Sequence, residues 1–199
     1  MYDPLDLSRQ TLETVFEPDQ LFTVPEGNLA TVADPDAREV LRTLGLPAGD
    51  NPWISVDQKI AERFRPVGEA YDWQLAARYS VVPPGADTWI DVGIIPYDGI
   101  ALDPETGRVY CLPQDGEIYL FNSKFRYFVH FLYVIQAELP YFDVEWEGTE
   151  EEDELFDPAA SRARTEAAMR AIDPAALEVP QSRWHKILEY IADPDAEYY

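Results

Sequence analysis

Residues 88–139 read TWIDVGIIPYDGIALDPETGRVYCLPQDGEIYLFNSKFRYFVHFLYVIQAEL, and this stretch carries the strongest secondary-structure pattern of the chain. Its first part holds short runs rich in β-branched and aromatic residues, which are typical of strands. These runs cover residues 89–95, 100–102, 108–112 and 117–121. The segment DPETG at 103–107 supplies a proline to start a turn and a glycine for a positive φ at its exit. Asp115-Gly116 marks the next reversal, so the stretch predicts an antiparallel meander.

A long helix follows the meander. Apolar residues recur at positions 125, 128, 129, 132, 135 and 139, which is helical spacing. We expect Phe128 and Leu132 on its inner face, Asn122-Ser123 as its cap, and Pro140 as its end. The segment is shorter than the roughly 20 apolar residues of a membrane span, and it contains charged residues. It is therefore predicted to be a core helix.

Weaker patterns flank this centre. On the N-terminal side we expect a short helix at 4–15, a short strand at 21–24, a turn at 25–28 and a helix opened by Asp34-Pro35 and ended by Gly45. For residues 48–87 we expect irregular connections and one or two strands that the pattern does not locate. On the C-terminal side we expect helices at 158–172 and 182–192. The fold class is thus α+β, with a mainly antiparallel sheet flanked by helices in a single domain over residues 1–199.

The charge restricts the partners. The 199 residues carry 15 Lys and Arg against 38 Asp and Glu, a formal net charge of −23, with a pI of about 4.2. Such a surface repels phosphate backbones and anionic membranes, which argues against nucleic-acid and membrane binding. The natural partner is basic, or small and neutral. With 46% hydrophobic residues the chain still has ample material for a core.

The sequence offers little catalytic chemistry. His130 and His185 lie within predicted helices among apolar neighbours, and Cys111 lies on a predicted strand, so we interpret all three as structural. We find no zinc-ligand spacing, no glycine-rich phosphate loop and no Gly-x-Ser-x-Gly elbow. The chain is therefore predicted to be no enzyme and to need no cofactor or metal. A single cysteine and a start without signal-peptide features indicate a cytoplasmic protein.

One segment departs from the background. Residues 127–161 contain no Lys or Arg but ten acids, most of them in an acidic loop at 143–157. Such a block is either a solvated loop or an anionic face that attracts a basic partner. Tyr141, Phe142 and Trp146 add interface-type aromatic side chains. The candidate partner-binding residues are Asp143, Glu145, Trp146, Glu147, Glu150, Glu151, Glu152, Asp153 and Glu154.

Several motifs together resemble a known family. They are GIALDPETGRVY at 99–110, YLFNS at 119–123 before the aromatic helix, FEPDQL at 16–21, REVLRTLGLP at 38–47, IDPAAL at 172–177 and WHKILEYI at 184–191. Over roughly residues 14–192 the chain resembles the SUKH superfamily, and more narrowly the fourth SUKH family of bacterial immunity proteins. Relatives often carry a second Ser where this chain has Lys124.

The resemblance implies an α+β domain with a twisted sheet, acting as the antidote to a toxin of a polymorphic toxin system. Such toxins are often nucleases or nucleic-acid deaminases, whose basic surfaces an acidic protein can cover. The leading hypothesis is thus a non-enzymatic immunity protein that binds a cognate basic toxin, as a monomer or weak dimer. The alternatives are a regulatory or scaffold binding module of the same fold and, more distantly, an enzyme with dispersed carboxylates.

Overall fold

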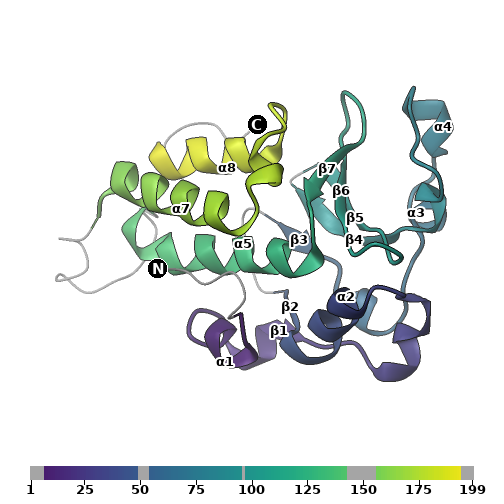
Figure 1. Cartoon of the computed structure of the whole chain (residues 1–199), viewed down its shortest axis with the longest axis horizontal. Coiled ribbons are helices and arrows are strands. Elements are labelled where there is room, and N and C mark those ends of the chain that lie inside the picture. Colours follow the sequence, from purple (N-terminus) through teal and green to yellow (C-terminus); the bar gives the residue numbers. More distant parts are fainter. Residues whose placement is uncertain (1–6, 49–53, 96, 143–155, 194–199) are drawn as a thin grey trace.

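The computed structural model describes residues 7–48, 54–95, 97–142 and 156–193. A five-stranded antiparallel sheet forms its centre, in the order β3-β4-β5-β6-β7 (Figure 1). These strands are β3 (Ser55–Val56), β4 (Ile90–Ile95), β5 (Asp98–Leu102), β6 (Val109–Leu112) and β7 (Tyr119–Asn122). A two-stranded antiparallel ladder pairs β1 (Leu21–Phe22) with β2 (Leu46–Pro47). The α+β class and the antiparallel meander are therefore confirmed.

The predicted hairpin between β5 and β6 forms at residues 103–107. The Asp103 amide donates to the Arg108 carbonyl over 2.9 Å, and the Gly107 amide donates to the Asp103 carbonyl over 2.9 Å. Gly107 has φ +70°, the left-handed conformation for which glycine was expected. The turn chemistry read from the sequence thus forms here, and the amides of Ala33 and Asp34 also donate to the Pro104 carbonyl of this turn.

Three helices lie on one side of the sheet, which we call the inner face (Figure 1). They are α5 (Phe125–Glu138), α7 (Pro158–Ile172) and α8 (Arg183–Ala192). Two of them, α5 and α8, contact β7, and the third, α7, packs on those two. Trp184 of α8 is fully buried, with its ring stacked 4.4 Å from that of Phe121 on β7. Phe128 and Leu132 of α5 are buried in the same core, as predicted. The aromatic side chains of three elements thus fill the space between sheet and helices.

The start of α5 differs from its prediction. Lys124, with no side-chain cap bond, takes the N-cap position in place of Asn122-Ser123. The buried carboxylate of Asp173 instead accepts hydrogen bonds from the Ser123 amide (2.8 Å), the Ser123 hydroxyl (2.8 Å) and the Asn122 side-chain amide (3.2 Å). The cap prediction was wrong because tertiary structure brings the Asp173 carboxylate close, and these side chains donate to it instead of accepting from the first amides of α5.

The N-terminal elements are shorter than expected. In place of the helix expected at 4–15, the described residues form α1 (Arg9–Leu12). The strand expected at 21–24 is shortened to the two residues of β1, and the turn expected at 25–28 leads into a 3-10 helix, η2 (Glu26–Thr31). Asp34 caps α2 (Pro35–Glu39) as predicted, because its carboxylate accepts from the Ala37 amide over 2.7 Å. The helix then widens into a π-helical turn, η3 (Val40–Leu44), and ends at Gly45 as expected.

Residues 48–87 are largely irregular, as expected. Besides β3, their described part holds two one-turn helices, α3 (Val67–Ala70) and α4 (Leu75–Arg78), and the 3-10 helix η4 (Gln58–Ala61). Further 3-10 helices are η1 (Pro18–Gln20), η5 (Ala86–Thr88), η6 (Leu139–Tyr141) and η7 (Pro174–Leu177).

Truncating the inner face of α5 should destabilise the protein. Phe128→Ala and Leu132→Ala each leave a cavity in a packed core, so we expect each to lower the free energy of unfolding by about 2–5 kcal/mol. Gln136→Ala on the same helix, at a half-buried polar position, is the matched control. Denaturant melts measure all three. Unchanged midpoints for both core variants would contradict the packing of α5.

His130, buried on α5, should make stability sensitive to acid. Burial lowers the pKa of its imidazole to about 4, from an ordinary value of 6.5. Below pH 6.5 the unfolded chain therefore binds a proton that the folded chain does not, and stability falls as the pH drops toward 4. At pH 5 this residue should account for a loss of about 2 kcal/mol.

Replacing His130 by Phe should remove that part of the loss. The test compares the change in unfolding free energy between pH 7 and pH 5 for the wild type, for His130→Phe and for the control His185→Gln. An equal change in all three proteins would show that His130 does not carry this acid sensitivity.

Candidate functional site

The second face of the sheet, the outer face, is partly covered by residues 67–89, which we call the arm (Figure 1). The Trp89 ring stacks on Tyr110 of β6 with their centroids 4.1 Å apart and their planes at 11°. The Tyr79 hydroxyl donates to the Pro113 carbonyl over 2.9 Å. Aromatic packing and this bond fix the arm to β5 and β6, which leaves the β3 and β4 side of the outer face open.

The far end of the arm is held by charged groups of the β6–β7 loop. The Glu117 carboxylate accepts from the Val81 amide over 3.1 Å and from both the amide and the hydroxyl of Ser80. These bonds lower the pKa of Glu117, the Ser80 hydroxyl having the largest effect. The Arg78 guanidinium lies 4.7 Å from the Trp73 ring centroid and donates to the Gln114 carbonyl. The arm is therefore anchored at both ends.

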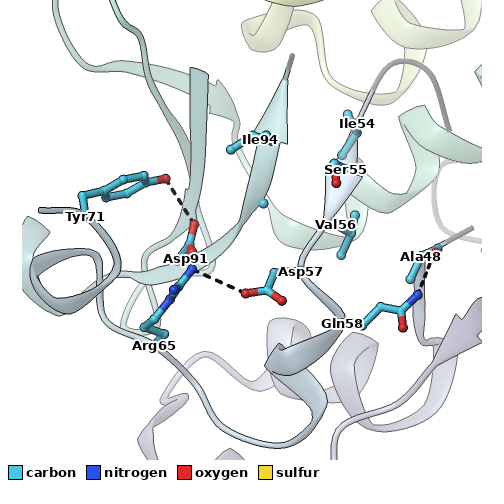
Figure 2. A pocket seen from close by; sticks show the side chains of 11 residues that line it. Ala48, Ile54, Ser55, Val56, Asp57, Gln58, Arg65, Tyr71, Asp91 and Ile94 are labelled. Atoms are coloured by element: carbon cyan, nitrogen blue, oxygen red, sulfur yellow. Dashed lines mark hydrogen bonds and ion pairs between the residues drawn. The ribbon is translucent and has the colours of Figure 1, made fainter. Parts of the chain in front are cut away.

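Between the arm and strand β3 lies a hollow of about 520 Å³, the outer-face hollow (Figure 2). Strands β3 and β4 form its floor. Its lining includes two residues of β4, Asp91 and Ile94. The other side chains used below are Ser55 of β3, Asp57 directly after β3, Arg65 after η4 and Tyr71 of the arm. Ile94 points outward from β4 and is 41% exposed, which is unusual for an aliphatic residue within a strand. The hollow therefore combines polar groups with an uncovered apolar side chain.

A buried carboxylate organises the polar groups. Asp91 is 6% exposed and accepts from the Arg65 guanidinium over 2.7 Å and from the Tyr71 hydroxyl over 3.2 Å. The same Arg65 nitrogen lies 3.4 Å from an Asp57 oxygen, so one guanidinium serves two carboxylates (Figure 2). Burial raises the pKa of Asp91, and the bonds from Arg65 and Tyr71 offset this only in part. The negative charge of Asp91 is thus incompletely compensated.

Two glycines allow this arrangement. A Cβ at Gly99 would lie 2.2 Å from the Tyr71 hydroxyl oxygen, so only glycine lets the tyrosine reach Asp91 across β5. A Cβ at Gly93 would lie 2.2 Å from the Ser55 carbonyl, and Gly93 has φ +151° beside a bulge in the β4–β5 pairing. Gly93 therefore lets β3 approach β4 closely and shapes the floor of the hollow.

The chemistry of the hollow favours recognition. Burial, followed by the neighbouring Asp91 charge, raises the pKa of Tyr71, so its hydroxyl stays protonated and acts as a donor. Among the described residues, no three His, Cys, Asp or Glu side chains gather as metal ligands. The arrangement offers carboxylates, one half-exposed guanidinium and apolar surface, which are groups that bind a protein side chain.

The predicted partner-binding residues lie outside the described residues. This holds for Asp143, Glu145, Trp146, Glu147, Glu150, Glu151, Glu152, Asp153 and Glu154. The neighbouring aromatic residues are described, and Phe142 is buried in the core while Tyr141 lies under the Arg164 guanidinium, 4.9 Å from its ring centroid.

Two acids at the ends of the acidic run have local structural roles. Glu138 is buried and pairs with Arg164 over 2.6 Å, and Asp157 caps α7 by accepting from the Ala160 amide over 3.0 Å. Residues 127–161 contain no Lys or Arg, yet Glu138 has a counterion in the structure. Its counterion comes from a different helix, 26 residues further along the chain.

The sequence analysis missed the hollow. Arg65 and Tyr71 come from the stretch in which the pattern located no elements, and Asp57 caps η4 by accepting from the Lys59 amide. One signal was present, because Asp91 is a charged residue inside a predicted buried strand. A carboxylate at such a position requires a partner. In the structure this partner is Arg65, 26 residues earlier in the chain.

The protein is thus an α+β domain with an open hollow on its outer face. The family model described as SUKH-4 immunity protein matches residues 7–190, and the chain belongs to this family. The earlier resemblance is thereby confirmed, and an immunity protein role follows from the family. No curated protein and no solved structure matches the chain. Among the described residues, no helix is long and apolar enough to cross a membrane.

The Asp91 network predicts coupled effects of two substitutions. Tyr71→Phe removes a donor to a buried carboxylate and should lower the free energy of unfolding by about 1–2 kcal/mol. Gly99→Ala should destabilise the wild type because its methyl group meets the Tyr71 hydroxyl, and it should cost about 1 kcal/mol less in the Tyr71→Phe background. Denaturant melts of the four proteins measure this coupling. Strict additivity would show that Tyr71 does not occupy the space above Gly99.

Proposed function

We propose that this protein is a non-enzymatic, cytoplasmic immunity protein that binds a cognate toxin of a polymorphic toxin system and blocks it by occlusion. The family match over residues 7–190 is the observation that carries the proposal. The toxin is a basic domain that acts on nucleic acid, a nuclease or a deaminase. The immunity protein acts as a monomer or weak dimer and binds neither nucleic acid nor membranes itself.

The charge distribution supports a basic partner. All 15 Lys and Arg lie in the described ranges, where at least ten of them pair with carboxylates within 4 Å. Thirteen of the 38 acids lie in the remaining segments, which contain no Lys or Arg. A surface with this excess attracts a protein built to bind nucleic acid, because such a protein must carry positive charge.

Co-expression tests the function directly. The toxin gene is sought beside the gene of this protein, and its toxin domain is expressed in cells with and without the immunity protein. We expect growth to be rescued only by the cognate immunity protein, and the two purified proteins to form a complex. Continued toxicity together with no complex would favour the alternative, a regulatory or scaffold module that binds some other protein.

The acidic run at 143–157 should act mainly on the rate of association. Replacing Glu150, Glu151, Glu152 and Glu154 by Gln removes four negative charges, which should lower the association rate constant about tenfold and flatten its salt dependence. Dissociation should change less, because exposed charges outside a contact steer the partner over about a Debye length, roughly 8–10 Å. Stopped-flow kinetics at two ionic strengths give both rates.

A matched variant separates local charge from total charge. Four exposed acids elsewhere are replaced to remove the same charge: Glu26→Gln, Glu105→Gln, Asp115→Asn and Glu178→Gln. We expect this control to change the association rate less than the acidic-run variant does. Equal effects of the two variants would mean that only the net charge matters and that the acidic run has no special role.

A further inference from the structure

The outer-face hollow is a recess where the arm leaves the sheet uncovered. Its volume, about 520 Å³, accommodates a large side chain. Ile94, one of its lining residues, is 41% exposed. An exposed aliphatic side chain within a polar recess gives a protein partner an apolar contact next to polar groups.

The charges in the hollow specify the occupant. Two carboxylates, Asp57 and Asp91, face a single guanidinium, and both approach the same nitrogen of Arg65. An adjoining hollow of about 340 Å³ shares these three residues and adds Lys59, Glu62 and the exposed Arg63–Glu69 pair. Across both hollows the carboxylates therefore exceed the cations by one. Because burial also leaves the charge of Asp91 incompletely compensated, a second cation here is favourable.

We propose that the outer-face hollow receives a lysine or arginine side chain of the toxin domain. This inference rests on the proposed function and deepens it. The ammonium or guanidinium group of the toxin lies between Asp57 and Asp91, and its aliphatic stem packs on Ile94. Arg65 is half exposed, so its guanidinium can shift and leave one of the two carboxylates to the incoming cation. The hollow holds the partner, whereas the acidic run accelerates its approach.

Ile94 offers a test that depends on the sign of a charge. Ile94→Arg places a cation at the rim and Ile94→Glu an anion, and both changes fall on an exposed side chain, so neither needs to disturb folding. The probe is the purified toxin domain encoded beside the gene, titrated against each variant by calorimetry. Thermal melts of the free variants establish that each is folded. Val81, an arm residue that is 67% exposed and lies outside the hollow, receives the same two substitutions as a control.

We expect Ile94→Arg to weaken binding at least about tenfold, because it sets like charges against each other, and Ile94→Glu to bind within about threefold of the wild type. The two control variants, Val81→Arg and Val81→Glu, should differ from each other in affinity by a much smaller factor. Asp57→Asn keeps the oxygen that caps η4 but removes the charge, so we expect about threefold to tenfold weaker binding through faster dissociation.

The possible failures are distinguishable. If the wild type does not bind the toxin domain, the proposed function fails. If the wild type binds but all Ile94 and Asp57 variants bind equally well, the hollow lies outside the interface and this inference fails alone. Tighter binding of Ile94→Arg than of Ile94→Glu would identify an anionic occupant, and equal weakening by both would identify an apolar one. Either result overturns the proposed cation.

Discussion

The arrangement of this protein depends on the buried carboxylate of Asp173, where α7 ends and η7 begins. It accepts three hydrogen bonds from Asn122, the last residue of β7, and Ser123, which follows it. The Trp184 indole donates to the Phe121 carbonyl over 3.2 Å and to the Asn122 side chain over 3.3 Å. One buried polar cluster thus ties the end of the sheet to the C-terminal helices and fixes the aromatic core between them.

This constraint decides which surface remains available. The helices close the inner face, and η7 with the start of α8 lies along β7, one edge of the sheet. At the opposite edge β3 contributes only two residues, and the arm covers the outer face over β5 and β6. The outer face is therefore open on the β3 and β4 side. There the backbone spacing, two glycines and the Asp91 network create a recess instead of a filled core.

Local patterns predicted the central sheet and the long helices. The strands between residues 89 and 121, α5, α7 and α8 follow from periodicity and turn chemistry, which act over a few residues. The hollow did not follow, because Arg65 meets Asp91 across 26 residues and Tyr71 meets it across 20. The cap prediction for Asn122-Ser123 was wrong for the same reason, because Ser123 donates to Asp173, which is 50 residues further along the chain. Contacts of this range depend on tertiary structure and leave no spacing signal.

Electrostatics and shape have separate roles in this account. The excess of acids supplies a long-range field, which sequence composition already reveals, and we propose that the hollow supplies a short-range fit, which only the fold reveals. In this it resembles other acidic proteins that bind basic partners quickly and hold them by a few buried groups. The family assigns the role, and we propose the outer face as the surface on which it is carried out.

Amide hydrogen exchange of the protein, alone and with the cognate toxin domain, tests the location of the interface most directly. The account predicts that toxin binding slows exchange at residues 54–58, along β3 and the start of η4, while α7 and α8 exchange as in the free protein. Slower exchange confined to α7 and α8, with residues 54–58 unchanged, would contradict it.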